Sequence, residues 1–276
     1  MAQAKDRFVL TEAMALRRSL TRTGKDIISD KIAALIASGV LGIGDELPSE
    51  RELATALDVS RETVRGAIQI LAARSVVEVS QGARTRVIST DLSAFHVDIA
   101  RHAAINSYDL EAVHAARLVI ERQVVADAAG HISAEALARL HNSLKAQKDC
   151  ADDPVRFLIC DREFHVTIYR ECGNPLLTDL VTDLYTYMME YRRRVMSRPG
   201  AIAKSYQEHK AIVAALEKHD REAVLKAFGH HLERIYTTTR LMIKTSKSQR
   251  STGQKKKSPV AEMPVEGRGN TNRVKH

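Results

Sequence analysis

Asp161 and His165 are the residues whose types and spacing first point to chemistry. They stand four positions apart in a segment with a helical pattern, so both side chains fall on one face, about one turn apart. His209 and His231, in two further predicted helices, could complete a set of three imidazoles and one carboxylate. Such a set suits zinc, nickel, manganese or iron. These four residues are a candidate metal site, with chance spacing among 11 histidines as the alternative.

A second group of informative polar residues lies within residues 47–73 and marks the ends of short predicted helices. Ser49 and Glu52 have the spacing of a capping box, so a first helix is expected to begin directly after the serine. Asp58 tolerates a left-handed turn after that helix, and Ser60 then caps a second helix. The stretch therefore predicts two helices joined by a tight turn.

The second helix has one apolar face and one polar face. The apolar positions recur at the spacing of a buried face, namely Val64, Ala67, Ile68 and Leu71. The outer face then carries Arg61, Glu62, Thr63, Arg65 and Gln69. Polar side chains at the N-terminal end of such a helix can reach base edges in the major groove. The pattern predicts a helix-turn-helix, and an ordinary pair of amphipathic helices is the alternative.

The elements around this pair predict a winged helix-turn-helix. A preceding helix runs from Lys25 to Ser38 and ends at Gly39. After Ala73, two β-branched runs surround a loop that contains Gly82, which is typical of a hairpin. Residues 21–90 are therefore expected to form a DNA-binding domain of three helices and a hairpin.

From residue 91 onward the pattern is almost entirely helical. Asp153 and Asn174 each precede a proline, the arrangement of an N-cap followed by proline at the first helical position. Residues 91–243 predict an all-α bundle of six or seven helices, so the whole chain is mainly α. Residues 244–276 have few large apolar side chains and predict a disordered basic tail, and residues 1–20 a mobile extension.

Length, charge and cysteine content bound the function. A chain of 276 residues accommodates two domains. Most of the net charge of +8 lies in the tail, where 9 basic residues face 2 acidic ones, so bulk charge says little about the folded part. Three cysteines without a C-x-x-C pair argue against a disulfide framework. Without a secretory signal or a long apolar run, the sequence predicts a cytoplasmic protein that does not contact a membrane.

The expected DNA-binding domain also resembles that of a known protein family. The segments GDELPSERELATAL and VSRETVR, followed by a valine-rich hairpin, resemble the DNA-binding domain of GntR-type bacterial transcription regulators. The resemblance implies DNA contacts at Arg51 of the first helix, at Arg61, Thr63 and Arg65 of the second, and at the wing near Gly82. Arginine reads guanine through its two-pronged donor and also binds phosphates.

Four positions depart from the usual pattern of this family. Asp58 and Ser75 stand where members usually carry glycine, and Arg84 replaces a second glycine of the wing. Gly66 occupies a position where a better helix former is common, at a cost of roughly 1 kcal/mol of helix propensity. These departures make the preferred base sequence of this chain hard to infer from the family.

The helical region resembles the FCD ligand-binding domain of the FadR subgroup of the same regulators. The similar segments are LEAVHAARLVIERQVVADAAG, DREFHVTIYRECGNP, EHKAIVAAL and HHLERI. In the members that contain a metal, the ligands match Asp161, His165, His209 and His231, with His230 as the alternative if the register differs by one. Arg117 implies an anionic effector near the metal, although an intrahelical pair with Glu121 accounts equally well for its spacing.

Together these expectations describe a repressor of a catabolic operon rather than an enzyme. A homodimer would present two recognition helices, one from each chain, to a near-palindromic operator. A small carboxylate or sugar-acid effector, bound at a divalent metal, would modulate operator binding, with zinc the expected ion. A metal-dependent hydrolytic enzyme on a helical bundle is the alternative.

Overall fold

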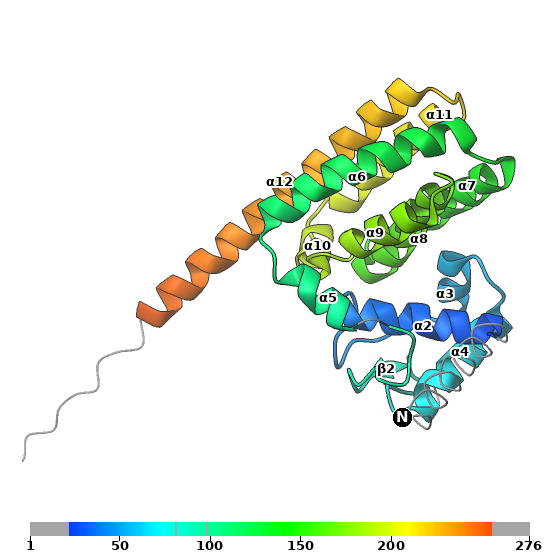
Figure 1. The fold of residues 1–276 in the computed structure, drawn as a ribbon. Coiled ribbons are helices and arrows are strands. Elements are labelled where there is room, and N and C mark those ends of the chain that lie inside the picture. The colour runs from blue at the N-terminus through cyan, green and yellow to red at the C-terminus, as the bar shows by residue number, and fades with distance from the viewer. Residues whose placement is uncertain (1–21, 81, 98, 256–276) are drawn as a thin grey trace, which may run out of the picture.

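The computed structural model describes residues 22–80, 82–97 and 99–255 (Figure 1). A small N-terminal head lies beneath a larger helical body, and the last helix projects from that body (Figure 1). The predicted extension at residues 1–20 and the tail beyond residue 255 lie outside the described residues.

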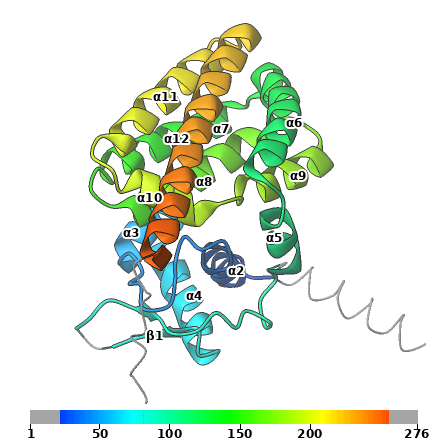
Figure 2. The same cartoon turned by 90° about the vertical axis from the view of Figure 1, so that its left-hand side faces the viewer.

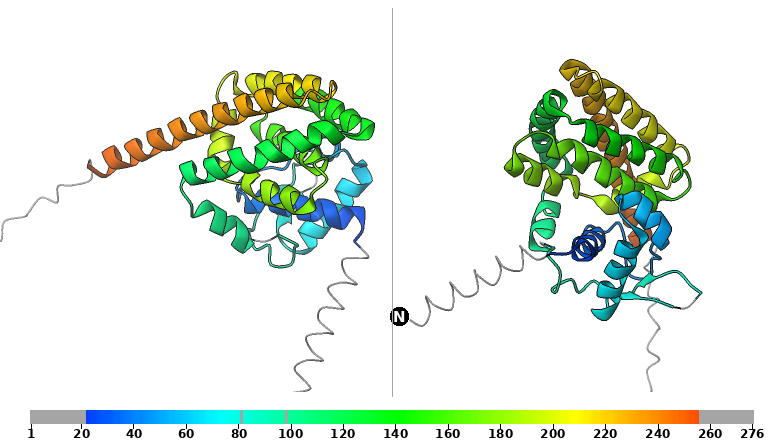
Figure 3. Two further views of the ribbon diagram at one scale, coloured as in Figure 1. Left: turned by 45° about the horizontal axis from the view of Figure 1, so that its top comes forward. Right: turned by 90° about the vertical axis from the view of Figure 1, so that its right-hand side faces the viewer.

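The head consists of three helices and a hairpin. Its elements are α2 (Gly24–Ala37), α3 (Glu50–Leu57), α4 (Arg61–Ala73), β1 (Val77–Glu78) and β2 (Arg86–Val87). The strands pair antiparallel, with Val77 opposite Val87, and the hairpin extends sideways from the head (Figure 3). The predicted winged helix-turn-helix is confirmed, and its helices pack around a buried core that includes Ile32, Leu53 and Leu71.

Local interactions explain where the helices of the head begin and end. The backbone N–H of Ser49 donates to Glu52 Oε2 at 2.8 Å, and that of Glu52 donates back to Ser49 Oγ at 3.3 Å, which is the predicted capping box. Ser60 Oγ accepts from the Thr63 N–H at 3.1 Å and begins α4. Asp58 closes α3 in the left-handed region, with φ of 53°. The sequence-predicted bounds of both helices are therefore correct.

Gly66 has a packing reason that its helix propensity does not reveal. A Cβ atom built on this residue would lie 3.3 Å from both Cβ and Cδ of Lys25, on α2. This separation is shorter than ordinary contact, so an added side chain here would require the Lys25 side chain to shift. The glycine permits the close approach of the two helices.

The body contains eight helices within the described residues, one or two more than predicted. They are α5 (Ile99–Asn106), α6 (Leu110–His131), α7 (Ala134–Lys148), α8 (Pro154–Arg170), α9 (Pro175–Tyr185), α10 (Met189–Met196), α11 (Ala201–Leu216) and α12 (Arg221–Lys255). Asp109 caps α6 and so separates it from α5. The break before α10 occurs at Met188, which has φ of 54° and provides no glycine or proline signal.

The last helix is longer than the sequence pattern predicts. The expectation of a tail without structure from residue 244 is wrong for residues 244–255, because α12 continues to Lys255. Figures 2 and 3 show that α12 crosses the body and then projects beyond it. No helix among the described residues is long and apolar enough to cross a membrane.

The body is built around α8, which packs against α6, α7, α9 and α10 and also against α3 of the head. Phe157, Phe164 and Tyr169 on α8 are fully buried. Burial of such aromatic side chains stabilises the fold by about 1.5–3 kcal/mol each. The same helix therefore forms the centre of the body and contacts the head.

Candidate metal centre and nucleic-acid interface

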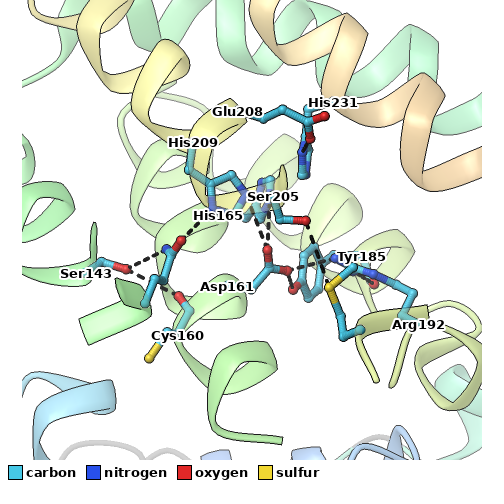
Figure 4. Close-up of polar contacts among 12 residues, drawn as sticks. Ser143, Cys160, Asp161, His165, Tyr185, Arg192, Ser205, Glu208, His209 and His231 are labelled. Carbon is cyan, nitrogen blue, oxygen red and sulfur yellow. Dashed lines mark hydrogen bonds and ion pairs between the residues drawn. The ribbon is translucent and has the colours of Figure 1, made fainter. Parts of the chain in front are cut away.

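Four polar side chains converge inside the body (Figure 4). Asp161 and His165 come from α8, His209 from α11 and His231 from α12, and all four are buried. Each offers one ligand atom, and these atoms lie within 4.8 Å of one another. The structure therefore brings together the four residues that the sequence predicted as metal ligands.

The cluster contains buried polar atoms that protein groups do not satisfy. Asp161 Oδ1 lies 3.3 Å from His209 Nε2 and 3.7 Å from His165 Nε2. Among the described residues, no group forms a hydrogen bond with either ring nitrogen of His165 or with Nε2 of His209. Buried polar atoms without partners are costly and call for an unseen partner such as an ion or water. One carboxylate and three imidazoles form a donor set that fits a divalent transition metal.

The histidine rings are held in the neutral form. Burial lowers the pKa of His165 to about 4, that of His209 to about 3 and that of His231 to about 4. A neutral imidazole keeps a lone pair on one nitrogen, which is the form that binds a metal ion. At neutral pH the cluster therefore presents lone pairs rather than positive charge.

Asp161 is oriented by two residues that the sequence analysis did not single out. Its Oδ2 accepts hydrogen bonds from the Tyr185 hydroxyl and from Arg192 Nη2, the latter at 2.8 Å. Burial alone raises the pKa of Asp161, but the Arg192 guanidinium and the His165 ring outweigh it, so this pKa lies well below its usual range. The carboxylate is thus ionised, with Oδ1 facing the imidazoles.

Two further residues orient histidine rings from outside the cluster, and one of them, Glu208, is labelled in Figure 4. His209 Nδ1 lies 2.7 Å from Gln147 Oε1, and His231 Nδ1 lies 2.7 Å from Glu208 Oε2. Because both oxygens are acceptors, each Nδ1 carries the proton and donates it. Nε2 of each ring is then left with its lone pair, the arrangement typical of the outer contacts of metal-ligating histidines. In the sequence, Gln147 gave no signal, and only its place on an inward helix face could have suggested it.

A small pocket adjoins this cluster. Its lining includes Val113, His114, Arg117, Tyr187 and Arg192, and the volume open to the centre of a water molecule is about 20 Å³, about that of a single water site. Arg117 lines the pocket, and its Nε also donates to Glu121 Oε1 at 2.6 Å. The intrahelical pair considered for Arg117 is therefore present, and it leaves the guanidinium beside the pocket.

His230 points away from the cluster. The side chain is 74% exposed, whereas that of its neighbour His231 is 2% exposed. The register expected for the last helix of the body is thus the one observed.

The residues expected to contact DNA lie on the head. Arg51, Arg61 and Arg65 are exposed, and Arg65 is held by Glu50 through Nη2–Oε2 at 3.0 Å. Thr63 is half-buried, and its hydroxyl lies 2.8 Å from that of the N-cap serine.

In the wing, Gly82 has φ of 75°, a conformation that favours glycine. Arg84 contacts Glu52 at 3.7 Å. The Arg84 side chain is half exposed and links the wing to α3.

A winged head joined to a helical body with a buried polar cluster defines a class of DNA-binding regulators with a ligand-responsive domain. Residues 25–87 match the family of bacterial regulatory proteins of the gntR type, and residues 112–234 match the FCD domain. The chain belongs to the GntR family of transcription regulators and carries an FCD domain. It is a DNA-binding regulator and not an enzyme, so the hydrolase alternative is not supported.

Individual proteins resemble the chain over most of its length. The HTH-type transcriptional repressor NanR of Salmonella newport is 28% identical over 259 residues, which cover 90% of this chain and 98% of that protein. NanR of Salmonella typhi is also 28% identical over 259 residues, with coverage of 90% and 97%. Among solved structures, E. coli McbR/YncC is 18% identical, covers 81% of this chain and 100% of that chain, and has a TM-score of 0.49.

Proposed function

We propose that this regulator is a repressor whose operator binding responds to a divalent metal ion and a small carboxylate or sugar-acid effector. The observation that carries the proposal is the buried cluster of one carboxylate and three neutral imidazoles beside an arginine-lined pocket. The relatives that bear the name repressor support the direction of control. A cytoplasmic location is part of the proposal.

In this proposal, Asp161, His165, His209 and His231 hold the metal, and zinc is the expected ion. Nickel, manganese and iron suit the same donors. When bound, the ion supplies a Lewis-acidic positive charge that favours an anionic effector. The chain contributes neutral imidazoles, a carboxylate oriented by Arg192, and a buried environment that strengthens these interactions.

The effector site in this proposal lies in the pocket beside the cluster. Arg117 and Arg192 both line it, and a guanidinium binds a carboxylate through two parallel hydrogen bonds. Nε of Arg192 is buried and has no hydrogen-bond partner among the described residues. An effector that enters would enlarge the pocket, because the present volume is about that of one water site.

The proposed reading head is residues 21–90, and the proposed effector domain is residues 91–243. DNA contacts are assigned to Arg51, Arg61, Thr63 and Arg65, and to the wing at Gly82. Arg65 would exchange its carboxylate partner Glu50 for DNA. A homodimer would present two such heads to a near-palindromic operator.

The DNA assignment is tested with a duplex that the full chain selects from a random pool. Arg61→Ala should weaken specific binding by about 1–3 kcal/mol without changing the melting temperature. Arg194→Ala is the matched control, because this exposed arginine lies on α10 of the body and pairs with Glu190. Unchanged affinity in both Arg61→Ala and Arg65→Ala would refute the assignment of α4 as the reading helix.

The metal assignment is tested by elemental analysis of purified protein. The wild-type chain should retain about one ion per chain, and the double variant His165→Ala, His209→Ala should lose it. His230→Ala is the control, since this exposed neighbour of a proposed ligand should leave the content unchanged. Equal metal content in the wild type and the double variant would contradict the proposal.

The effector site is tested with a series of short carboxylates and sugar acids, read by thermal shift of the zinc-loaded protein. A compound at 100 times its Kd should stabilise the protein by about 2.7 kcal/mol. Arg117→Lys keeps a positive charge beside Glu121 but removes the planar donor, so it should reduce that shift. A series in which no compound shifts the wild type would argue against a carboxylate effector.

A further inference from the structure

Two neighbouring arginines on α10 connect different parts of the molecule. Arg192 is buried, donates to Asp161 Oδ2 at 2.8 Å and lines the pocket beside the candidate metal cluster. Arg193 contacts the head: its Nη2 donates to Asp45 Oδ1 at 3.0 Å and its Nη1 donates to the Val40 carbonyl at 3.2 Å. A displacement of this short helix therefore changes contacts at both places.

Asp45 lies in the turn that precedes α3 and contacts the wing of the head. Its Oδ2 accepts from the Gly42 N–H at 2.7 Å, which closes the turn before α3. Its backbone carbonyl accepts from the Val87 N–H of β2 at 2.9 Å, and the Gly44 N–H donates to the Val87 carbonyl at 2.8 Å. The turn to which Arg193 donates hydrogen bonds is thus also hydrogen-bonded to the wing. It leads into α3, the first helix of the helix-turn-helix.

α10 is a short helix that follows a residue with a strained backbone. It has eight residues, and its N-cap residue, Met188, has a left-handed backbone with φ of 54° and a side chain that makes no capping hydrogen bond. Methionine in this region is strained by about 1–3 kcal/mol, and such strain occurs at switch segments. Met188 and Arg192 both line the pocket, so a ligand there contacts α10 directly.

We propose that α10 transmits the occupancy of the metal and effector sites to the reading head. When Asp161 binds a metal ion, the carboxylate to which Arg192 donates changes, and α10 shifts in response. This shift moves Arg193 and the turn that contains Asp45. The inference rests on the proposed function, because it requires metal or effector binding in the body. Arg193 is a positioning residue that favours one placement of the head, and ligand binding changes DNA affinity through that preference.

Two other contacts between the head and the body involve α8 and not α10. Lys31 of α2 pairs with Glu163 of α8, and Arg156 of α8 lies 3.4 Å from Glu52 of α3. Glu163 and Arg156 both lie on α8, a helix of 17 residues that is buried on several sides. These pairs hold the head against the body in the same way as Arg193, but without touching the pocket. They therefore provide a control for the loss of a contact between the head and the body that does not involve α10.

The test measures the ratio of DNA dissociation constants for the full chain with zinc and with a chelator. The probe is a duplex that the wild type selects from a random pool. The wild-type ratio should lie in the range of about 5- to 150-fold. Arg193→Ala should reduce the ratio to about twofold or less and leave zinc affinity within about twofold of wild type. Asp45→Asn should act in the same direction while retaining an oxygen that accepts from Gly42.

Two control variants should retain the wild-type ratio. Arg194→Ala removes an exposed arginine of α10 whose ion pair, among the described residues, is with Glu190 of the same helix. Lys31→Ala removes a pair between the head and α8. Melting temperature and zinc affinity, measured for every variant, identify any protein that has failed to fold.

The outcomes separate the two proposals. A wild type that binds no zinc refutes the metal centre itself, and the transmission with it. A wild type that binds zinc and DNA with a ratio of one leaves the metal centre in place but overturns the proposed response of operator binding to the metal, and the transmission with it. If Arg193→Ala and Asp45→Asn both fold and keep the full ratio, α10 does not couple the sites. If Lys31→Ala abolishes the ratio as fully as Arg193→Ala, the coupling does not depend on α10 in particular, and the proposal is overturned.

Discussion

Gln147→Leu removes the hydrogen bond that orients one ring of the candidate metal centre. Gln147 and His209 are both fully buried, and their contact of 2.7 Å places the proton on Nδ1 of the histidine. Leucine has a similar volume but accepts no hydrogen bond. The proton on His209 can then move to Nε2, which is the nitrogen that faces Asp161. A protonated Nε2 cannot bind a metal ion.

The expected magnitude follows from this geometry. Loss of an outer contact of a metal-ligating histidine weakens metal affinity by about 10- to 100-fold, or roughly 1.4–2.7 kcal/mol. In metal-free protein the variant leaves Nδ1 of His209 buried without a partner, which costs about 1–3 kcal/mol of folding stability. The two effects are separable because one is measured by zinc titration and the other by urea unfolding with a chelator present.

The assay is competition for zinc between the protein and a chromophoric chelator. Ser143→Ala is the matched control: its hydroxyl accepts from Gln147 Nε2 at 3.2 Å, one hydrogen bond further from the cluster. This variant should change zinc affinity by no more than about fivefold, because a neutral hydrogen bond contributes about 1 kcal/mol. Wild-type zinc affinity in a folded Gln147→Leu protein would refute the reasoning.

Two further predictions concern packing and pH. Gly229→Ala in α12, where an added Cβ meets no atom within 4 Å, should raise the free energy of unfolding by about 0.5–1 kcal/mol. Gly66→Ala should bring no such gain, because its Cβ would lie 3.3 Å from Lys25; equal gains in urea unfolding would contradict the packing argument. The pKa values of the three cluster histidines, about 3 to 4, lie below the value of about 6.5 in the unfolded chain. The unfolded chain therefore binds more protons, and metal-free protein should lose stability as the pH falls from about 6.5 to 4. The double variant His165→Ala, His209→Ala should flatten this dependence, and the same slope in both proteins would count against buried neutral rings.

Much of the head could be predicted because its signals are local. The capping box at Ser49, the cap at Ser60 and the apolar spacing of α4 each involve residues within one or two turns. The reason for Gly66 could not be found in this way, since it depends on Lys25 of another helix. The hydrogen bonds between Arg65 and Glu50 likewise join residues of two helices.

The body shows the same division between local and distant information. Proline after Asp153 and Asn174 correctly placed the starts of α8 and α9. The split at Met188 had no such signal, because the left-handed backbone there belongs to a residue that rarely adopts it. The length of α12 does not follow from composition, because the polar residues after Lys244 favour disorder, whereas the helix continues to Lys255.

The candidate metal cluster was predictable in its four members and not in its surroundings. Asp161 and His165 share a helix face, a relation that spacing alone predicts. Arg192 and Glu208 come from other helices, and only the packed body brings them to the cluster. Cys150 and Cys160 show the same limitation: both are buried free thiols, and their sulfur atoms lie 4.0 Å apart although no close sequence motif links them.

The most direct test of the account is a crystal of the full chain grown with zinc and measured on both sides of the zinc absorption edge. The account predicts one anomalous peak per chain, at about 2.0–2.2 Å from Asp161 and from Nε2 of His165, His209 and His231. An empty cluster in such a crystal, or a peak held instead by exposed residues such as His230, would contradict the central claim.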